Sequence, residues 1–167
     1  MNRKIELAAY APRYEQVTLD RIARFWGFHG GLVGVQEEDA CCVREDLTCW
    51  TGEGHCLYVI LEDGTDVGFV HLYRAGPIVM ELADLFVDEC RRGRGIATAA
   101  IALAEAEAKA TPGVEAMILQ VVTRNERALR LYHHLGYDTM STVTLRKEFG
   151  KNRRDQQAQF LGLPFHI

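Results

Sequence analysis

The chain has 167 residues, a formal net charge of −4 and a hydrophobic content of 48%. These values are typical of one globular domain with enough apolar side chains for a sizeable core. The acidic balance argues against a general nucleic-acid binder, and no apolar run is long enough to span a membrane. The first residues also lack the apolar segment of a signal peptide, so we expect a cytoplasmic protein.

The cysteines do not follow a metal-site or disulfide pattern. They are five in number, which is odd, and they contain no C-x-x-C pair: Cys41, Cys42, Cys49, Cys56 and Cys90. Zinc sites and disulfide frameworks usually show paired spacings. We therefore expect reduced thiols and no metal.

The first third of the chain is predicted to hold a strand at residues 2–9 and a helix at 13–28. Gly27 and the Gly30-Gly31 pair are expected to end that helix. Beyond it, a helical turn at 36–42 is the clearest feature. The acidic side chains here are Glu37, Glu38, Asp39, Glu45, Asp46 and Glu53. They form either a solvated loop face or a wall for a cationic amine.

Apolar runs at residues 56–61 and 67–73 predict two strands. The Asp63-Gly64 pair between them is a strong signal for a tight β-hairpin. Another apolar run at residues 82–87 predicts the next strand. The three runs together predict an antiparallel meander.

A glycine-rich turn leads from the strand at 82–87 into a helix predicted at 94–110. Its pattern is R-x-x-G-x-A, formed by Arg92, Gly93, Arg94, Gly95, Ile96 and Ala97. The first N–H groups of a helix have no internal partner, and the helix dipole favours negative charge there. Gly93 and Gly95 lack a Cβ, so a phosphate could approach the main chain closely. The plainer alternative is a turn with solvated arginines, because neither nucleotide-binding glycine fingerprint is complete here.

The predicted helix carries Ile96, Ala100, Leu103 and Ala106 on one face and ends at residues 111–113. The nearly continuous apolar run at 114–122 predicts a central strand that is buried on both faces. Two crossover connections imply a partly parallel sheet, so we expect an α/β fold.

The last third of the fold is predicted as a helix followed by a strand. Thr123 and Glu126 fit a capping box at the start of the helix, and Gly136 suits its C-terminal end. Residues 137–148 are then predicted as the last strand.

A second motif, N-x-x-A-x-x-x-Y-x-x-x-G-Y, runs from Asn125 to Tyr137 and starts 28 residues after Ala97. The two motifs, with a helix and a strand between them, resemble the GNAT superfamily of acetyl-CoA-dependent N-acetyltransferases. The resemblance implies a GNAT fold with a central mixed sheet of six to seven strands and about four helices. It implies one domain at residues 1–149 and a tail at 150–167.

The resemblance also implies where acetyl-CoA binds. Its pyrophosphate would lie on the R-x-x-G-x-A turn, and its pantetheine arm between two splayed strands. The arm would pair with the strand at Leu85, Phe86 and Val87, and Asn125 would hold it. The main-chain N–H near Val87 would polarise the thioester carbonyl.

Catalytic roles follow from what acetyl transfer needs. Tyr132 lies seven residues after Asn125 on the same helix face, and an ordinary phenol is protonated at neutral pH. The resemblance therefore implies that Tyr132 is the general acid, against the alternative of a core aromatic. Asp84 or Glu81 could be the base, against the alternative of strand-end or substrate-orienting carboxylates. Gln120, where one branch carries a glutamate base, cannot act as one, and His71 is a remote candidate.

We therefore predict an acyltransferase that acetylates a primary amine of a small, cationic acceptor similar to an aminoglycoside or polyamine. The alternatives are a protein or peptide amine acetyltransferase and a non-catalytic acyl-CoA sensor. Acetyl-CoA is the co-substrate, and we expect no metal, no nucleic acid and no membrane partner. The apolar end of the tail, residues 160–167, is expected to dock on its own body or on a second subunit as a homodimer.

Overall fold

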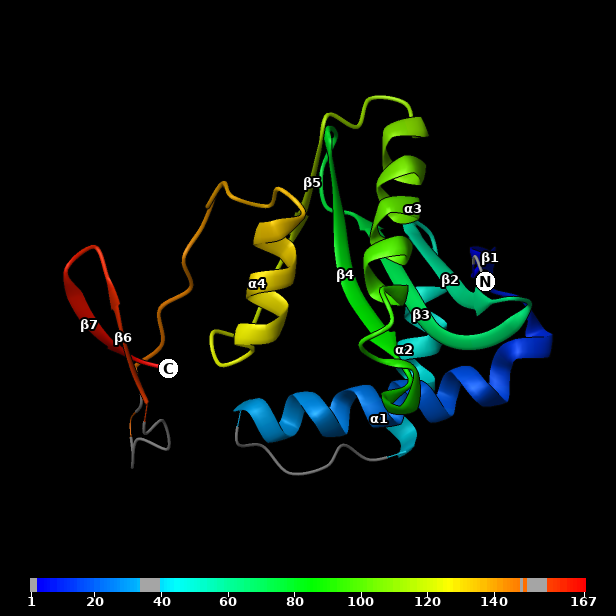
Figure 1. The fold of residues 1–167 in the computed structure, drawn as a ribbon, viewed down its shortest axis with the longest axis horizontal. Helices are drawn as coiled ribbons and strands as arrows, with labels where there is room; N and C mark the ends of the chain where they lie inside the picture. The colour runs from blue at the N-terminus through cyan, green and yellow to red at the C-terminus, as the bar shows by residue number, and fades with distance from the viewer. Residues whose placement is uncertain (1–2, 34–39, 148, 150–155) are drawn as a thin grey trace.

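The computed structural model describes residues 3–33, 40–147, 149 and 156–167. A five-stranded sheet with the order β1-β2-β3-β4-β5 lies at its centre (Figure 1). The strands are β1 (Ile5–Ala9), β2 (His55–Glu62), β3 (Thr65–Arg74), β4 (Val79–Val87) and β5 (Ala116–Leu119). The pairs β1–β2, β2–β3 and β3–β4 are antiparallel, and the pair β4–β5 is parallel. A separate hairpin of β6 (Gln157–Phe160) and β7 (Leu163–His166) lies near the C-terminus.

Helices cover both faces of the central sheet. They are α1 (Glu15–Val33), α2 (Ala40–Trp50), α3 (Ile96–Ala110) and α4 (Glu126–His134), with 3-10 turns η1 (Pro12–Tyr14) and η2 (Glu89–Arg91). Within the described residues, no helix is long and apolar enough to cross a membrane. The result is an α/β fold with a mixed sheet, as the sequence predicts.

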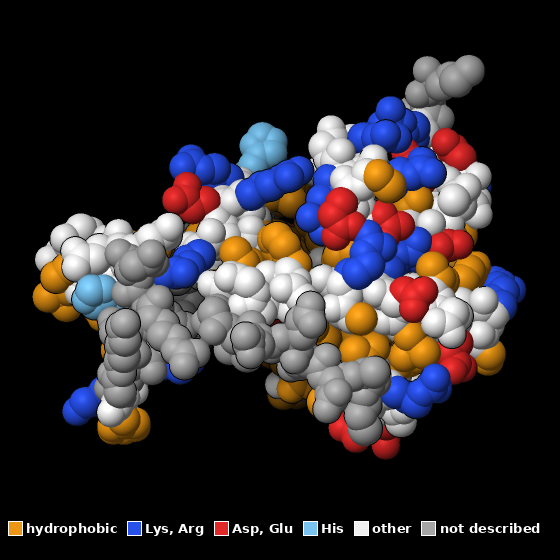
Figure 2. Space-filling view, turned by 90° about the horizontal axis from the view of Figure 1, so that it is seen from below, with side chains coloured by type: hydrophobic (Ala, Val, Ile, Leu, Met, Phe, Trp, Pro, Cys, Tyr) orange, Lys and Arg blue, Asp and Glu red, His pale blue; other side chains and the backbone are white. Residues whose placement is uncertain are grey.

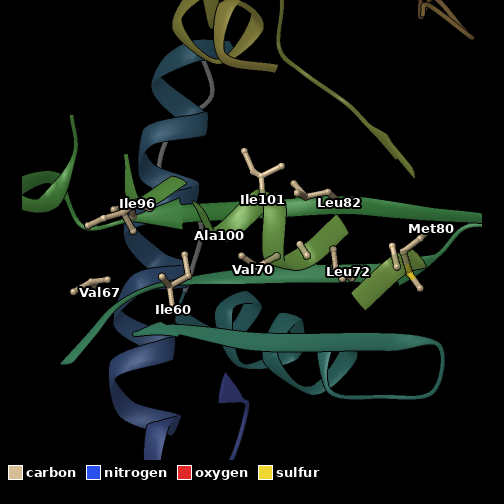
Figure 3. Close-up of a cluster of buried hydrophobic side chains, with 12 residues drawn as sticks. Ile60, Val67, Val70, Leu72, Met80, Leu82, Ile96, Ala100 and Ile101 are labelled. Atoms are coloured by element: carbon tan, nitrogen blue, oxygen red, sulfur yellow. The ribbon is translucent and has the colours of Figure 1, made fainter. Parts of the chain in front are cut away.

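The hydrophobic core has two parts, one on each sheet face. On one face α3 packs over β3 and β4 through Ile96, Ala100 and Ile101, which meet Val70 and Leu72 (Figure 3). On the other face α1 and α2 pack on the sheet through Ile22, Phe25, Leu47 and Trp50, which meet Phe69. Successive side chains of a strand point to opposite faces, so Phe69 and Val70 serve different halves of the core.

The expected helix ends need correction. α1 continues through Gly27 and the Gly30-Gly31 pair to Val33, so the prediction that they end it is wrong. Each glycine costs about 1 kcal/mol relative to alanine in a helix. Packing offsets this cost, and the rings of Phe25 and His29, on either side of Gly27, have centroids 4.4 Å apart.

α2 extends the predicted turn at 36–42 far toward the C-terminus, and residues 34–39 with their acidic side chains lie outside the described residues. Val43, Leu47 and Trp50 are buried and recur at helical spacing, which is the sequence pattern of an amphipathic helix. The charged residues between them made this pattern hard to recognise.

The buried face of α3 also differs from the prediction. It contains Ile101, Ala104 and Ala108 beside Ile96 and Ala100, whereas Ala106 is exposed and Leu103 is half-buried. The Ala-rich composition hides the true face, because nearly every position of this helix is apolar.

The predicted strands after α3 are also corrected. Residues 114–122 yield only β5, which lies at the edge of the described sheet and is not fully buried. Residues 138–147 form no strand, so the central sheet has five strands rather than six or seven. A long apolar run predicts burial on both faces only when another strand pairs beside it, and no strand of the described residues pairs on the far side of β5. The hairpin at Asp63-Gly64 is confirmed, with φ of +51° and +80°.

Candidate active site

A cavity of about 560 Å³ opens where β4 and β5 stop pairing. The two strands pair only from Val79 with Ala116 to Leu82 with Leu119. At that point β4 also carries a bulge, because His71 of β3 pairs with Asp84 whereas Leu72 pairs with Leu82. The bulge leaves Ala83 without a partner on β3, and Ala83 lines the cavity. Bulges often re-aim side chains beside functional sites, and this one lies where the strands separate.

The predicted cofactor residues converge on this cavity. Those that line it are Leu85, Phe86, Val87, Arg92, Gly93, Gly95, Ile96, Ala97, Asn125 and Tyr132. Of the other predicted residues, Arg94, Asp84 and Glu81 are outside the lining. Arg94 is exposed, and its carbonyl oxygen accepts a hydrogen bond from Nη1 of Arg3 at 3.4 Å.

The turn before α3 has an open cradle of backbone N–H groups. Gly93 and Gly95 have φ of +76° and +79°, a region that favours glycine, and no side chain caps the helix. A Cβ built on either glycine would meet nothing within 4 Å. Arg92 and, from α4, Arg127 also line the cavity. Burial and the nearby charge of Arg127 lower the pKa of Arg92. Free N–H groups at a helix N-terminus beside two guanidinium groups fit a diphosphate.

The position of Tyr132 is fixed by the way α4 begins and ends. The side chain of Asn125 caps the first turn by accepting from N–H of Ala128 at 3.2 Å, so Asn125 and not Thr123 is the N-cap. At the other end Gly136 has φ of +94°, and N–H of Tyr137 donates to the Tyr132 carbonyl at 3.0 Å. This is a Schellman ending, which confirms Gly136 as its glycine.

Tyr137 then ties this end of α4 to α3. Its ring contacts that of Tyr132 with centroids 5.9 Å apart, and its hydroxyl donates to Oε1 of Glu105 at 3.0 Å. Burial and the charge of Asp84 raise the pKa of Tyr132 to about 12. The Tyr132 phenol is therefore protonated throughout the neutral pH range.

The two candidate bases lie in different surroundings. Oδ2 of Asp84 lies 2.7 Å from Nδ1 of His71, on the sheet face that α1 and α2 cover. Its charge reaches Tyr132 and His29, both of which line the cavity. Glu81 instead accepts from Nε2 of Gln120 at 3.2 Å. Asp84 is thus the carboxylate electrostatically linked to the Tyr132 phenol.

Sequence reasoning missed the contribution of α1. Phe25, Phe28 and His29 line the cavity, and Phe25 and His29 are one helical turn apart. Their spacing was visible in the sequence, but the predicted helix ended before His29. Among the acidic residues, Asp46 accepts from Nε1 of Trp26 at 2.7 Å, and burial raises its pKa.

The cysteines whose side chains the structure describes, Cys42, Cys49, Cys56 and Cys90, are exposed and form no disulfide with one another. Within the described part of the chain, no three His, Cys, Asp or Glu side chains are grouped to hold a metal ion.

Residues 20–137 match the model of the acetyltransferase (GNAT) family. A search of curated proteins found no match. Two solved structures of aminoglycoside N-acetyltransferase AAC(6′)-Iy are similar: one, in complex with CoA, has a TM-score of 0.69 and 14% identity over 90% of this chain and 98% of that one. The other, with a bisubstrate analogue, has a TM-score of 0.68 and 15% identity over 87% and 98%.

A third similar structure is a ribosomal-protein-alanine N-acetyltransferase from Brucella melitensis. It has a TM-score of 0.64 and 19% identity over 86% of this chain and 100% of that one. At such identities the similarity to solved structures shows only a shared fold. The match to the family model covers most of the chain and is therefore evidence for the family as well as the fold.

Proposed function

The chain belongs to the acetyltransferase (GNAT) family, and on that premise we propose that it moves the acetyl group of acetyl-CoA to a primary amine of a small cationic acceptor. One observation carries the proposal. The open N–H cradle at Gly93 and Gly95 and the protonated phenol of Tyr132 line the same cavity.

The cavity suits acetyl-CoA as the acetyl donor. The diphosphate would bind the backbone N–H groups at the start of α3, with Arg92 and Arg127 beside it. The pantetheine arm would lie between the separated ends of β4 and β5, next to Leu85 and Val87. The AAC(6′)-Iy structure with CoA has the same fold, which supports this placement.

The reaction needs one new bond, one broken bond and three proton movements. The ammonium group of the bound acceptor first loses one proton to solvent, and the resulting neutral amine attacks the thioester carbonyl carbon, so a C–N bond forms and the C–S bond breaks. The leaving thiolate takes the phenolic proton of Tyr132, and Asp84 accepts the proton that the amine loses. Exchange with solvent returns both residues to their starting states.

A cationic acceptor is favoured by the carboxylates near the cavity. Asp84 and Asp46 lie close enough for the charge of Asp84 to raise the pKa of Asp46. The rings of Phe25 and His29 line the adjoining wall and offer apolar and π surface to an ammonium group. Two carboxylates beside aromatic rings are a suitable environment for an aminoglycoside or polyamine.

The test is a panel of amines incubated with acetyl-CoA, with free thiol as the readout. The panel contains aminoglycosides, polyamines and peptides with free N-termini. We expect thiol release with at least one small polycation and acetylation of its amine by mass spectrometry. Turnover with peptides alone would contradict the small-molecule acceptor, and CoA binding without any turnover would favour a sensor.

A further inference from the structure

Three titratable side chains from three neighbouring strands form a continuous hydrogen-bonded row. Nδ1 of His71 lies 2.7 Å from Oδ2 of Asp84, and Nε2 of the same ring lies 2.8 Å from Nδ1 of His55. Beyond His55, Sγ of Cys49 lies 4.0 Å from its Nε2. His71 is only 3% exposed, whereas His55 is half-buried and Cys49 is exposed. The row therefore runs from the interior beside the active site to the surface.

The direction of the hydrogen bonds follows from the chemistry of Asp84. An ionised carboxylate can only accept, so the proton of neutral His71 is on Nδ1. Its Nε2 must then accept, and His55 must donate from its own Nδ1. Both N–H groups thus point toward Asp84 and stabilise its charge.

Packing holds the two rings in this arrangement. The ring planes of His55 and His71 differ by 15°, with centroids 5.1 Å apart, as expected for imidazoles joined edge to edge through nitrogen. Trp50 of α2 stacks on His71 at 4.7 Å. The bulge in β4 supplies the other partner, because it brings Asp84 opposite His71. His71 is therefore fixed from three sides.

We propose that His71 and His55 are positioning residues for Asp84, and that they hold its carboxylate oriented to receive the ammonium group of the acceptor. His71 occupies one carboxylate oxygen, Oδ2, which leaves the second for the amine. The inference rests on the acetyl transfer proposed above, because that reaction is what brings an amine to Asp84.

A dependence on pH follows. With both rings neutral the row carries one negative charge, and a proton taken up by His55 cancels it. Other titratable groups facing the row are Asp46 from α2, His29 from α1 and Tyr132 from α4. Tyr73 of β3 also stacks on His55, with ring centroids 5.2 Å apart. Burial and the neighbouring His71 lower the pKa of His55, so its ring is neutral at neutral pH. A cationic acceptor should bind more weakly once acidification protonates a ring.

Calorimetry of spermidine and kanamycin binding to the CoA-saturated protein tests the proposal without turnover. His55→Ala removes the donor, and His55→Asn keeps an N–H donor near Nδ1 but cannot titrate. His134→Asn, at an exposed histidine of α4, is the matched control. We expect His55→Ala to weaken amine binding about tenfold and His55→Asn to restore most of it. The His55→Asn variant should also lose most of the decrease in amine affinity that acidification below about pH 6.5 produces.

CoA affinity should be the same in all variants, because none of the substitutions touches the diphosphate turn. Equal amine affinity in the wild type and His55→Ala, or no amine binding by the wild type, overturns the inference. Thiol release from acetyl-CoA is measured separately. Thiol release with unchanged amine affinity in His55→Ala overturns this inference alone. The expected binding pattern without thiol release overturns the proposed function alone.

Discussion

Tyr132 is the residue on which the proposed chemistry depends most directly. Tyr132→Phe keeps the ring and its contact with Tyr137 but removes the only proton that the side chain can donate. Loss of a general acid typically costs about 10²–10⁴-fold in rate. We expect kcat to fall within that range while the Kd for CoA, measured by calorimetry, stays unchanged.

Tyr58→Phe is the matched control for that substitution. Burial raises the pKa of Tyr58 to about 12 as well, but Tyr58 lies on β2 and does not line the cavity. Its kcat should equal that of the wild type. Equal kcat for Tyr132→Phe and Tyr58→Phe would remove Tyr132 from the mechanism.

Some site residues were accessible from sequence because one element carries them. Asn125 and Tyr132 are seven residues apart on one helix, so their common face follows from helical geometry. The pairing of His71 with Asp84 was not accessible, because it depends on a bulge that shifts the register of β3 against β4. A one-residue shift moves a side chain to the other face, and no local pattern specified it.

The turn between β4 and α3 should be sensitive to substitution of its glycines. Gly95→Ala forces a side chain into φ of +79°, which costs about 1–2 kcal/mol, and places a methyl group in the open cradle. We expect both a lower melting temperature and CoA binding that is weaker by about tenfold or more. Calorimetry and thermal unfolding measure the two effects separately.

Gly54→Ala separates strain from ligand contact. Gly54 also has φ of +79° and nothing within 4 Å of a Cβ, but it precedes β2 and lies outside the cavity lining. It should lose similar stability and keep the CoA affinity of the wild type. If both variants bound CoA equally well, the turn would not hold the diphosphate.

The attachment of α1 to the end of β4 gives a prediction about stability. Both oxygens of Asp88 accept hydrogen bonds from buried Arg21, at 3.1 and 2.8 Å, and Oδ1 also accepts from Arg24 at 3.0 Å. These arginines lower the pKa of Asp88 against the opposing effect of burial. Basic and acidic side chains also lie side by side on the surface viewed in Figure 2. Asp88→Asn should lower the free energy of unfolding at pH 7 by about 2 kcal/mol.

The same pair should respond to acid in a defined direction. Because the pKa of Asp88 is lower in the folded protein, its contribution is present above the unfolded pKa of about 3.9 and is lost as pH falls through the folded value. The difference between wild type and Asp88→Asn in urea unfolding should therefore shrink below about pH 4. Asp138→Asn, at an exposed aspartate, should show no difference at any pH. A constant difference for Asp88→Asn down to pH 3 would contradict this role.

Elements that are determined by a short sequence pattern could be predicted, whereas elements whose extent depends on pairing with another strand could not. The hairpin at Asp63-Gly64 and the end of α4 at Gly136 each follow from a glycine with positive φ in a defined turn. The residues from 114 to 122 are as apolar as a central strand, yet β5 covers only Ala116–Leu119. The difference depends on which strand pairs beside it, and that is a property of the whole sheet.

At the scale of the molecule, one edge of the sheet and the C-terminal region stand out. Beyond β5 the described sheet has no further strand, and residues 138–147 run without pairing. Large apolar side chains are exposed in these residues (Met140, Val143 and Leu145), at Phe149, and in the β6–β7 hairpin (Leu161 and Leu163). The hairpin lies apart from the central sheet in Figure 1, although Nε of Arg124 donates to the Ile167 carbonyl at 2.8 Å. An open strand edge and exposed apolar side chains are features that association with another chain would cover.

Deleting residues 156–167 tests whether this region holds two copies of the chain together. We expect the full chain to be a dimer by sedimentation and the deletion variant to be a monomer with a lower melting temperature. The reason is that the deletion removes the hairpin, whose exposed Leu161 and Leu163 would share the dimer interface with Met140, Val143, Leu145 and Phe149. Arg124→Ala, which removes the hydrogen bond from the segment before α4 to the Ile167 carbonyl but keeps the hairpin, should remain dimeric. A full chain that is monomeric at all concentrations, or a deletion variant with unchanged mass and melting temperature, would show that the hairpin does not hold copies together.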